Sequence, residues 1–430
     1  MDGRTGEGGG QLVRVAIALA AVTTRPVRIT HVRGNRPSRS GGKGGESPQK
    51  ADAFFLILGL KAQHVTAIRW LAEATEADVE GLEVGSETLT FAPRIPPSAA
   101  LETKSRWVKI AADSGAASTL LILQAVLPFL LYAADAEDEP TPVELEITGG
   151  TNVGWSLSYE YLDQVLLPRL ESAFGINVSR RLKTRGWSLG PQGRGAMCLT
   201  IHPLKRGRPL RPSLSPASPA DLEVRYVDVT MLVPSHMHAD LQDALSREVS
   251  DVLPSAELGF KIVEDSGSDA RIYVLLVARS AEGNYRWGRD ILMSTPKKAG
   301  KKKNQESLAS VVSRRVVADL ARELSVHGST CDEFLQDQLV IFQALAEGQT
   351  SFPRDDSHVA GAAAADVEVL EQDVARLDVG ERMRRDRTHK PFGTGSMHSQ
   401  TARWVASEIL PGVEWYNKGA VCKGVGTSFD

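Results

Sequence analysis

The chain has 430 residues, of which 42% are hydrophobic and 24% charged, and its formal net charge is −3. A chain of this length can bury one or two hydrophobic cores. Its nearly balanced charge excludes a general attraction to nucleic acid, so any such binding needs a local basic cluster.

A glycine run opens the chain, in DGRTGEGGGQLVR at 2–14, and leads into the apolar segment LVRVAIALAAVT. Three successive glycines let the backbone approach a ligand closely, and their N–H groups can hold an anion. The apolar segment is amphipathic at helical spacing, so the run would lie at a helix N-terminus, where the dipole favours phosphate. A simple tight turn is the commoner explanation of so short a motif.

Short strands alternate with amphipathic helices through the first 200 residues. Apolar residues recur at i, i+3 and i+4 in the helices and at every second position in the strands. This pattern predicts an α+β domain in which helices cover one face of several small sheets. The clearest segments are 26–32, 62–75, 77–93, 116–133, 143–150 and 158–175.

A segment rich in Pro, Ser and Arg, at 204–219, predicts a linker. A small α/β unit follows from about 221 to 295, and helical patterning returns from about 306. We therefore predict one large domain, residues 1–205 and 313–430, interrupted by an inserted α/β domain at 216–312. The segments 39–48 and about 351–390 lack the apolar density for a fixed structure, and we expect surface loops.

Cysteine usage and hydropathy bear on the compartment. Cys198, Cys331 and Cys422 lie far apart with no CxxC spacing, which argues against a disulfide framework or a zinc site and favours a reducing compartment. No apolar run reaches the roughly 18 residues of a membrane span, and the N-terminus lacks a secretory signal. We expect an intracellular protein, nuclear or cytoplasmic, without a membrane partner; the sequence leaves its oligomeric state open.

Ten blocks then occur in one order: DGRTGEGGGQLVR, VRGNR, GLKAQHVTA, VEGLEVGSETLTFAP, DSGAASTLLILQAVLP, ITGGTN, TRGWSLGPQGRG, DEFLQDQLVIFQALAEG, SMHSQTA and CKGVG. In this the chain resembles the RNA 3'-terminal phosphate cyclases, of the eukaryotic type with the catalytic histidine retained. The resemblance implies repeated βαβαββ modules, like those of the enolpyruvate transferases, with an inserted small α/β domain. It implies an ATP-dependent, ligase-class enzyme that adenylylates a histidine, passes AMP to an RNA 3'-phosphate and closes a 2',3'-cyclic phosphate.

The resemblance places the nucleophile at His398, in SMHSQTA. A neutral imidazole is nucleophilic near pH 7, and a covalent intermediate divides one difficult transfer into two easier ones. An isolated histidine would more often be a surface or capping residue. The implied nucleotide pocket is built from FLQDQ and one residue of the preceding module: Phe334, Leu335, Gln336, Asp337, Gln338 and Gln124.

Two positions depart from the family pattern. Phe334 stands where the family usually has tyrosine, so stacking on a base is kept and a hydroxyl is lost. The proline that tends to follow GGTN, on the other face of the adenine, is replaced in TNVGWSLS, with Leu157 or Trp155 as substitutes. These departures put nucleotide preference in doubt.

The resemblance also implies residues that hold the metal ion and the RNA phosphate. Glu7 is the implied ligand of Mg²⁺ or Mn²⁺, since such ions prefer oxygen ligands; the alternative is an exposed N-terminal acid. Arg14, Arg33, Arg36 and Gln63 are the implied contacts to the RNA substrate and its 3'-phosphate, because guanidinium groups grip phosphate bidentately.

An insertion at about 37–58 separates the block VRGNR, at 32–36, from the block GLKAQHVTA, at 59–67. Its apolar half, ADAFFLIL, is unusual for a surface loop, and a lineage-specific helix and an error in the gene model both stay open. The lysine cluster PKKAGKKK at 296–303 has three interpretations: extra RNA affinity, a nuclear targeting patch, or a solvated loop.

Three functions are compared. The catalytic cyclase agrees with His398, Glu7 and the glycine run. A non-catalytic cyclase-like RNA-binding factor in ribosomal RNA processing is the alternative, although its class has lost the histidine. An enolpyruvyl transferase would have no use for FLQDQ together with HSQTA.

Overall fold

The structure is a computed structural model that describes residues 1–35, 58–102, 104–112, 114–191, 193–213, 217–294, 307–354 and 392–430. Arg36, nearly all of the insertion at 37–58, the lysine cluster at 296–303 and most of the segment at 351–390 lie outside the described residues.

The second module has the complete βαβαββ order. Its sheet runs β4-β5-β7-β6, with β4 and β5 parallel and the other pairs antiparallel. Residues of β5 alternate between buried and less buried positions, so the sheet has one face in the core and one outside. The elements are β4 (Trp107–Ala111), α4 (Thr119–Leu131), β5 (Val143–Gly149), α5 (Tyr159–Tyr161), the π-helical turn η2 (Leu162–Leu166), α6 (Leu167–Phe174), β6 (Val178–Thr184) and β7 (Gly195–Ile201).

The first and third modules are shorter versions of the same plan, with sheets ordered β1-β3-β2 and β12-β14-β13. The first contains α1 (Gly10–Thr23), β1 (Val27–Ile29), α2 (Ala62–Thr75), β2 (Asp78–Glu80), β3 (Leu89–Ala92) and α3 (Pro97–Ala100). The third contains α9 (Glu333–Leu345), β12 (Glu347–Ser351), α11 (Met397–Ile409), β13 (Glu414–Tyr416), the 3₁₀ turn η6 (Asn417–Gly419) and β14 (Val421–Val425). The predicted α+β fold of repeated modules is confirmed.

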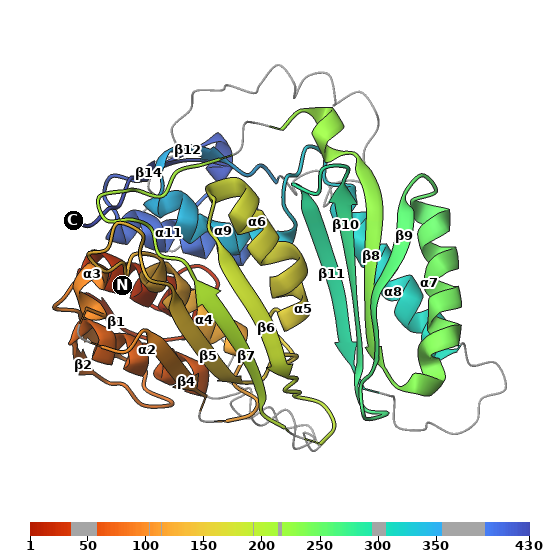
Figure 1. Cartoon of the computed structure of the whole chain (residues 1–430), viewed down its shortest axis with the longest axis horizontal. Coiled ribbons are helices and arrows are strands. Elements are labelled where there is room, and N and C mark those ends of the chain that lie inside the picture. The colour runs from red at the N-terminus through yellow and green to blue at the C-terminus, as the bar shows by residue number, and fades with distance from the viewer. Residues whose placement is uncertain are drawn as a thin grey trace.

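Helices from the three modules pack against one another and form a shared core (Figure 1). Helix α1 contacts α2, α4 and α11, and α9 contacts α11 and α4. Helix α4 is apolar on nearly every side, as a helix surrounded by other elements must be. This packing brings the beginning and the end of the chain together.

The inserted unit has its own four-stranded sheet, ordered β11-β10-β8-β9, covered by α7 and α8. Residues 272–278 of strand β10 form an apolar run because this central strand is buried on both faces of the sheet. Val274 and Leu276 pack beneath the two helices, whereas Tyr273 and Leu275 belong to the core of the main body. The unit contains η3 (Pro219–Leu222), β8 (Val224–Val233), η4 (Ser235–Met237), α7 (His238–Val252), β9 (Glu257–Asp265), β10 (Ile272–Ser280), β11 (Arg286–Met293) and α8 (Leu308–Leu324).

Helix α8 joins the inserted unit to the main body. Its residues Val312, Val316 and Leu320 pack into the core of the inserted unit. The domain boundary predicted between residues 312 and 313 therefore falls inside this helix.

Asp332 ties the inserted unit to the main body. Its carboxylate caps α9 by accepting from the N–H groups of Phe334 and Leu335, both at 2.9 Å. It also accepts from the Tyr161 hydroxyl at 2.6 Å and from the Gly288 N–H of β11 at 2.7 Å. A side chain at Gly288 would lie 2.7 Å from the Tyr161 ring, so only glycine permits this approach.

Asp332→Ala is expected to lower the free energy of unfolding by about 2–4 kcal/mol, since it removes a helix cap and leaves two buried donors without an acceptor. Urea denaturation followed by circular dichroism measures the change. The control is Ser307→Ala, which removes the exposed cap of α8 (Ser310 N to Ser307 Oγ, 3.1 Å) and should cost about 1 kcal/mol. Equal losses in the two variants would contradict this role for Asp332.

Candidate active site

At the start of α1, neighbouring side chains pack directly against the backbone of the glycine run. A side chain at Gly9 would collide with the carboxylate of Glu7. One at Gly10 would lie 2.7 Å from both Arg14 Nη1 and His64 Nε2. Gly8 has a φ of +60°, a conformation that favours glycine. The run therefore makes room for an acid, an arginine and a histidine around the N-terminus of α1.

Glu7 and His398 are in contact although they lie near opposite ends of the sequence. The Glu7 Oε2 atom lies 3.3 Å from His398 Nδ1, and the side chains are 11% and 48% exposed. The backbone N–H of Glu7 donates to Thr401 Oγ1, one turn further along α11, at 2.9 Å. Ser396 caps α11 by accepting from Ser399 N, which holds His398 in the first turn of the helix. An acid and a half-exposed imidazole thus form a fixed pair.

Helix α4 contributes Gln124 to the same cluster. Arg14 Nε donates to Gln124 Oε1 at 2.5 Å, and Arg14 Nη2 donates to Gln11 Oε1 at 2.7 Å. Gln124 Nε2 donates to the same Gln11 oxygen at 3.2 Å. Residues from all three modules therefore converge beside Glu7 and His398. Gln11 was not among the predicted site residues, although its place in GEGGGQ could have indicated it.

Asp337 of α9 is a buried carboxyl group in the electrostatic field of this cluster. Burial raises the pKa of Asp337 from 3.8 to about 6; the charges of His398 and Arg14 lower it, and that of Glu7 raises it. Gln338 Nε2 donates to Asp337 Oδ1 at 3.1 Å. The cluster thus keeps a strongly perturbed acid next to the histidine, a feature that is common at functional sites.

The remaining residues of FLQDQ divide between the site and the core. Gln336 is buried against the turn that precedes α11, where a side chain at Gly395 would lie 2.5 Å from Gln336 Oε1. Leu335 is fully buried in the main hydrophobic core, so its side chain has a packing role.

Phe334 is 38% exposed, and a cation already covers one face of its ring. The guanidinium carbon of Arg289, from the inserted unit, lies 4.5 Å from the ring centroid. Tyr161 meets the ring edge-on, with centroids 6.3 Å apart. A nucleotide base can therefore stack only on the opposite face. Of the two substitutes considered for the missing proline, Trp155 is highly exposed and Leu157 packs against the main core.

A second group, of basic residues, lies beside the glycine run. His64 begins the first turn of α2 and is buried. Burial, followed by the charges of Arg14, Arg33 and Lys61, lowers the pKa of His64 well below 6.5. Lys61 N donates to His64 Nδ1 at 3.1 Å, which makes His64 a neutral ring with its proton on Nε2.

Burial and the charge of Arg33 lower the pKa of Lys61 to about 8. Arg33 has a φ of +61°, and Gln63 lies in the first turn of α2 next to His64. Lys61 was not predicted as a site residue, although it belongs to GLKAQH at 59–64, the block that contains Gln63 and His64. Arg36 lies outside the described residues.

The donor set around Glu7 fits a hard divalent cation. Within the described ranges, no group of three or more His, Cys, Asp and Glu side chains could hold a metal by itself. A single carboxylate suits Mg²⁺, which takes most of its ligands from water and from substrate phosphates.

The chain belongs to a recognised family. Residues 5–372 match the family model described as RNA 3'-terminal phosphate cyclase. Curated relatives with that name include the proteins of Pyrococcus abyssi, 32% identical over 350 residues (81% of this chain and 86% of the relative), and Methanosarcina mazei, 31% identical over 369 residues (82% and 88%). The protein of Thermococcus onnurineus is 28% identical over 392 residues (89% and 96%). The chain is therefore a member of the RNA 3'-terminal phosphate cyclase family, as its blocks predicted.

Asp337→Asn is expected to raise the free energy of unfolding at neutral and alkaline pH. A carboxyl group whose pKa is raised in the folded state binds more protons there than in the unfolded chain, so stability falls as the pH rises from about 4 to 6. An amide removes that cost, and the variant should be about 1–3 kcal/mol more stable than wild type at pH 8.

Urea denaturation at pH 4 and pH 8 measures this difference, with Asp138→Asn at an exposed bend as the control that should change little. A variant that is less stable than wild type at pH 8 would contradict the assignment of Asp337 as a buried, destabilising acid.

Proposed function

We propose that the protein is an ATP-dependent RNA 3'-phosphate cyclase, which converts an RNA 3'-phosphate end to a 2',3'-cyclic phosphate through a covalent histidine–AMP intermediate. The observation that carries the proposal is the contact of His398 with Glu7, beside Arg14, Gln124 and Asp337. Family membership supports the substrate class, since the relatives are named for action on RNA 3'-phosphate ends.

His398 has the geometry of a nucleophile. Its Nδ1 faces Glu7, so the contact favours the tautomer with the proton on Nδ1 and leaves the Nε2 lone pair for attack. In the proposed first step a bond forms between Nε2 and the α-phosphorus of ATP, while the bond to the bridging oxygen breaks and diphosphate leaves with the electron pair. The carboxylate of Glu7 stabilises the imidazolium that results.

The two later steps regenerate the histidine. An oxygen of the RNA 3'-phosphate attacks the α-phosphorus and displaces Nε2, which gives an RNA-adenylate. The adjacent 2'-hydroxyl then attacks the 3'-phosphorus, a proton is lost, and AMP leaves with the electron pair. Arg14, Arg33, Lys61 and Gln63 are the groups that we assign to the RNA 3'-phosphate, because the charges of the first three act on the buried His64 beside the glycine run and Gln63 precedes His64 in α2; Arg36 stays a prediction from the sequence.

The proposal includes the remaining ligands. Glu7 would hold Mg²⁺ or Mn²⁺, which offsets charge on the triphosphate when it is bound. Asp337, Gln338 and the free face of Phe334 would bind the nucleoside, with Gln336 behind them and Gln124 at the α-phosphate. The three cysteines are unpaired, which fits the reducing nucleus or cytoplasm expected from the sequence. In the part of the chain that the structure describes, no helix has both the length and the apolar character needed to cross a membrane.

His398→Ala is expected to abolish covalent labelling by α-labelled ATP. Glu7→Gln should keep the fold and reduce the rate of labelling by about tenfold to a thousandfold, since one charged partner of the transition state is lost. Labelled protein is measured after denaturing electrophoresis, with the exposed His236→Ala as a control that should label normally. A wild-type protein that is folded, supplied with Mg²⁺ and unlabelled would refute the catalytic proposal and favour a non-catalytic RNA-binding factor.

Lys61 predicts a pH dependence of RNA binding. With its pKa lowered to about 8, the ammonium loses its charge as the pH rises through 8, so the KM for an RNA ending in 3'-phosphate should rise above that pH. Lys61→Arg keeps the positive charge and should flatten the profile. Cyclisation is followed as resistance of the end to phosphatase between pH 7 and about 9.5. Lys205→Arg, at an exposed ion pair, is the control and should behave as wild type; an unchanged profile for Lys61→Arg would contradict the assignment.

A further inference from the structure

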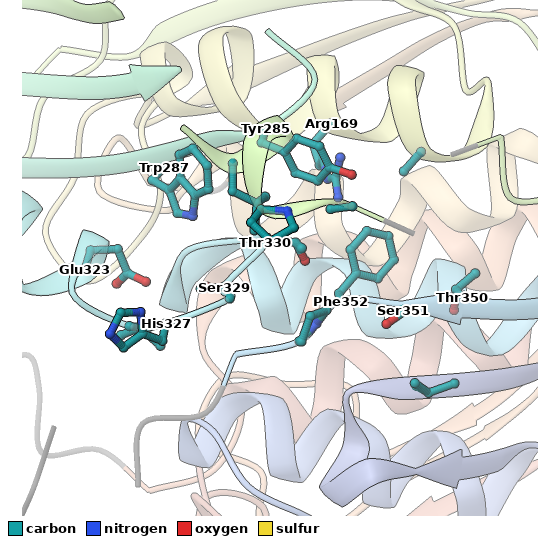
Figure 2. Close-up of a pocket in the computed structure, with 18 of the residues that line it drawn as sticks. Arg169, Tyr285, Trp287, Glu323, His327, Ser329, Thr330, Thr350, Ser351 and Phe352 are labelled. Atoms are coloured by element: carbon teal, nitrogen blue, oxygen red, sulfur yellow. The ribbon is translucent and has the colours of Figure 1, made fainter. Parts of the chain in front are cut away.

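A cavity of about 800 Å³ lies between the inserted unit and the third module (Figure 2). Helix α6, strands β11 and β12 and the end of α8 contribute to its wall, and none of its lining residues belongs to the cluster around His398. Much of the wall is apolar; it includes Pro212, Leu222, Val224, Leu324, Val326 and Pro353. Its size is within the range of about 300–1,000 Å³ that is typical of small-molecule sites.

Arg169 supplies a buried cation to this wall. Arg169 is 2% exposed. Its guanidinium carbon lies 4.6 Å from the ring centroid of Tyr285 and 5.1 Å from that of Phe352. Nη1 donates to the backbone oxygen of Asn284 at 2.9 Å. Nε is buried and has no hydrogen-bond acceptor among the residues that the structure describes. The aromatic rings thus orient the cation and leave one of its donors unused.

Thr330 lines the same cavity and has a second unused group. It is 4% exposed, and its Oγ1 makes no hydrogen bond within the described part of the chain. Its backbone N–H donates to Pro353 O at 3.1 Å, so the residue itself is well fixed. Buried polar atoms without partners are rare in folded proteins, and two residues that line this cavity each have one.

The charges at the cavity favour an anion. Glu323 is the acidic residue of the wall, and its carboxylate accepts from Arg354 Nε at 2.9 Å and from Arg289. Its charge is therefore neutralised by two arginines, and the positive charge of Arg169 is left to attract a ligand. The rest of the wall is apolar and cannot replace the water around a free ion. A ligand with an apolar body therefore fits the cavity better than an ion alone.

We propose that this cavity binds a small molecule with a phosphate or carboxylate head and an apolar body. The head lies at the part of the wall that Arg169 and Thr330 form, where the positive charge of Arg169 attracts it, and the body lies against the proline, valine and leucine side chains. This site is separate from the proposed cyclase reaction and does not depend on it.

The test uses isothermal titration calorimetry of the full chain with phenyl phosphate, inorganic phosphate and benzoate. Because the basic residues near His398 also attract phosphate, the titration is repeated with Arg14→Ala. Phenyl phosphate or benzoate is expected to bind once per chain and more tightly than inorganic phosphate, with the same affinity in Arg14→Ala; which of the two binds better identifies the head. Failure of both organic anions to bind, or loss of their binding in Arg14→Ala, would overturn the proposal.

Thr330→Val tests the position of the head with little change in volume. Since the hydroxyl makes no internal bond, the variant without ligand should have a Tm no lower than that of wild type, while its affinity for the organic anion falls on the order of tenfold. Thr350→Val is the matched control: its hydroxyl accepts from Gln343 Nε2 at 3.0 Å, so its loss should lower the Tm and keep the affinity. Wild-type affinity in Thr330→Val would contradict the assigned site.

Discussion

The packing of α1, α4, α9 and α11 against one another is the constraint on which the candidate site depends. Each helix carries one part of the site: Glu7 precedes α1, Gln124 lies in α4, Asp337 in α9 and His398 in the first turn of α11. No two of these parts are neighbours in the chain. The hydrogen bond from Glu7 N to Thr401 Oγ1 joins positions 394 residues apart and fixes the acid opposite the histidine.

Two buried groups of the site, Asp337 and His64, do not favour folding in their charged forms. Burial raises the pKa of Asp337 and lowers that of His64, so both residues are held in surroundings that oppose their charged forms. Proteins keep such groups where activity requires them, at a cost in stability. Burial also raises the pKa of Asp332 to about 6, but its carboxylate accepts four hydrogen bonds and joins two units of the structure.

Much of the fold was predictable from the sequence, because strong local patterns specify it. The segment 62–75 was expected as one regular element and is α2, and the alternation in VELEITG matches the buried and less buried positions of β5. The helical period also sorts FLQDQ: Phe334, Asp337 and Gln338 share one side of α9, whereas Leu335 faces the core. The spacing of residues 334–338 along a helix is enough to predict this division.

Other features depend on contacts that no local pattern contains. The cation over the ring of Phe334 comes from Arg289, in a unit with its own core, and the neutral state of His64 follows from burial and from three cations on other elements or turns. The cavity beside Arg169 arises only where two units meet. Pairings of this kind follow from tertiary packing, which the spacing of residues along one helix or strand does not determine.

The most direct test of the central claim is to find where ATP modifies the protein. The wild-type chain is incubated with ATP and Mg²⁺, digested without acid, and its peptides are mapped by mass spectrometry. If His398 is the nucleophile, adenylate is expected on the peptide that contains His398, attached to Nε2 of the imidazole. Adenylate on a different residue, with His398 unmodified in the folded protein, would contradict it.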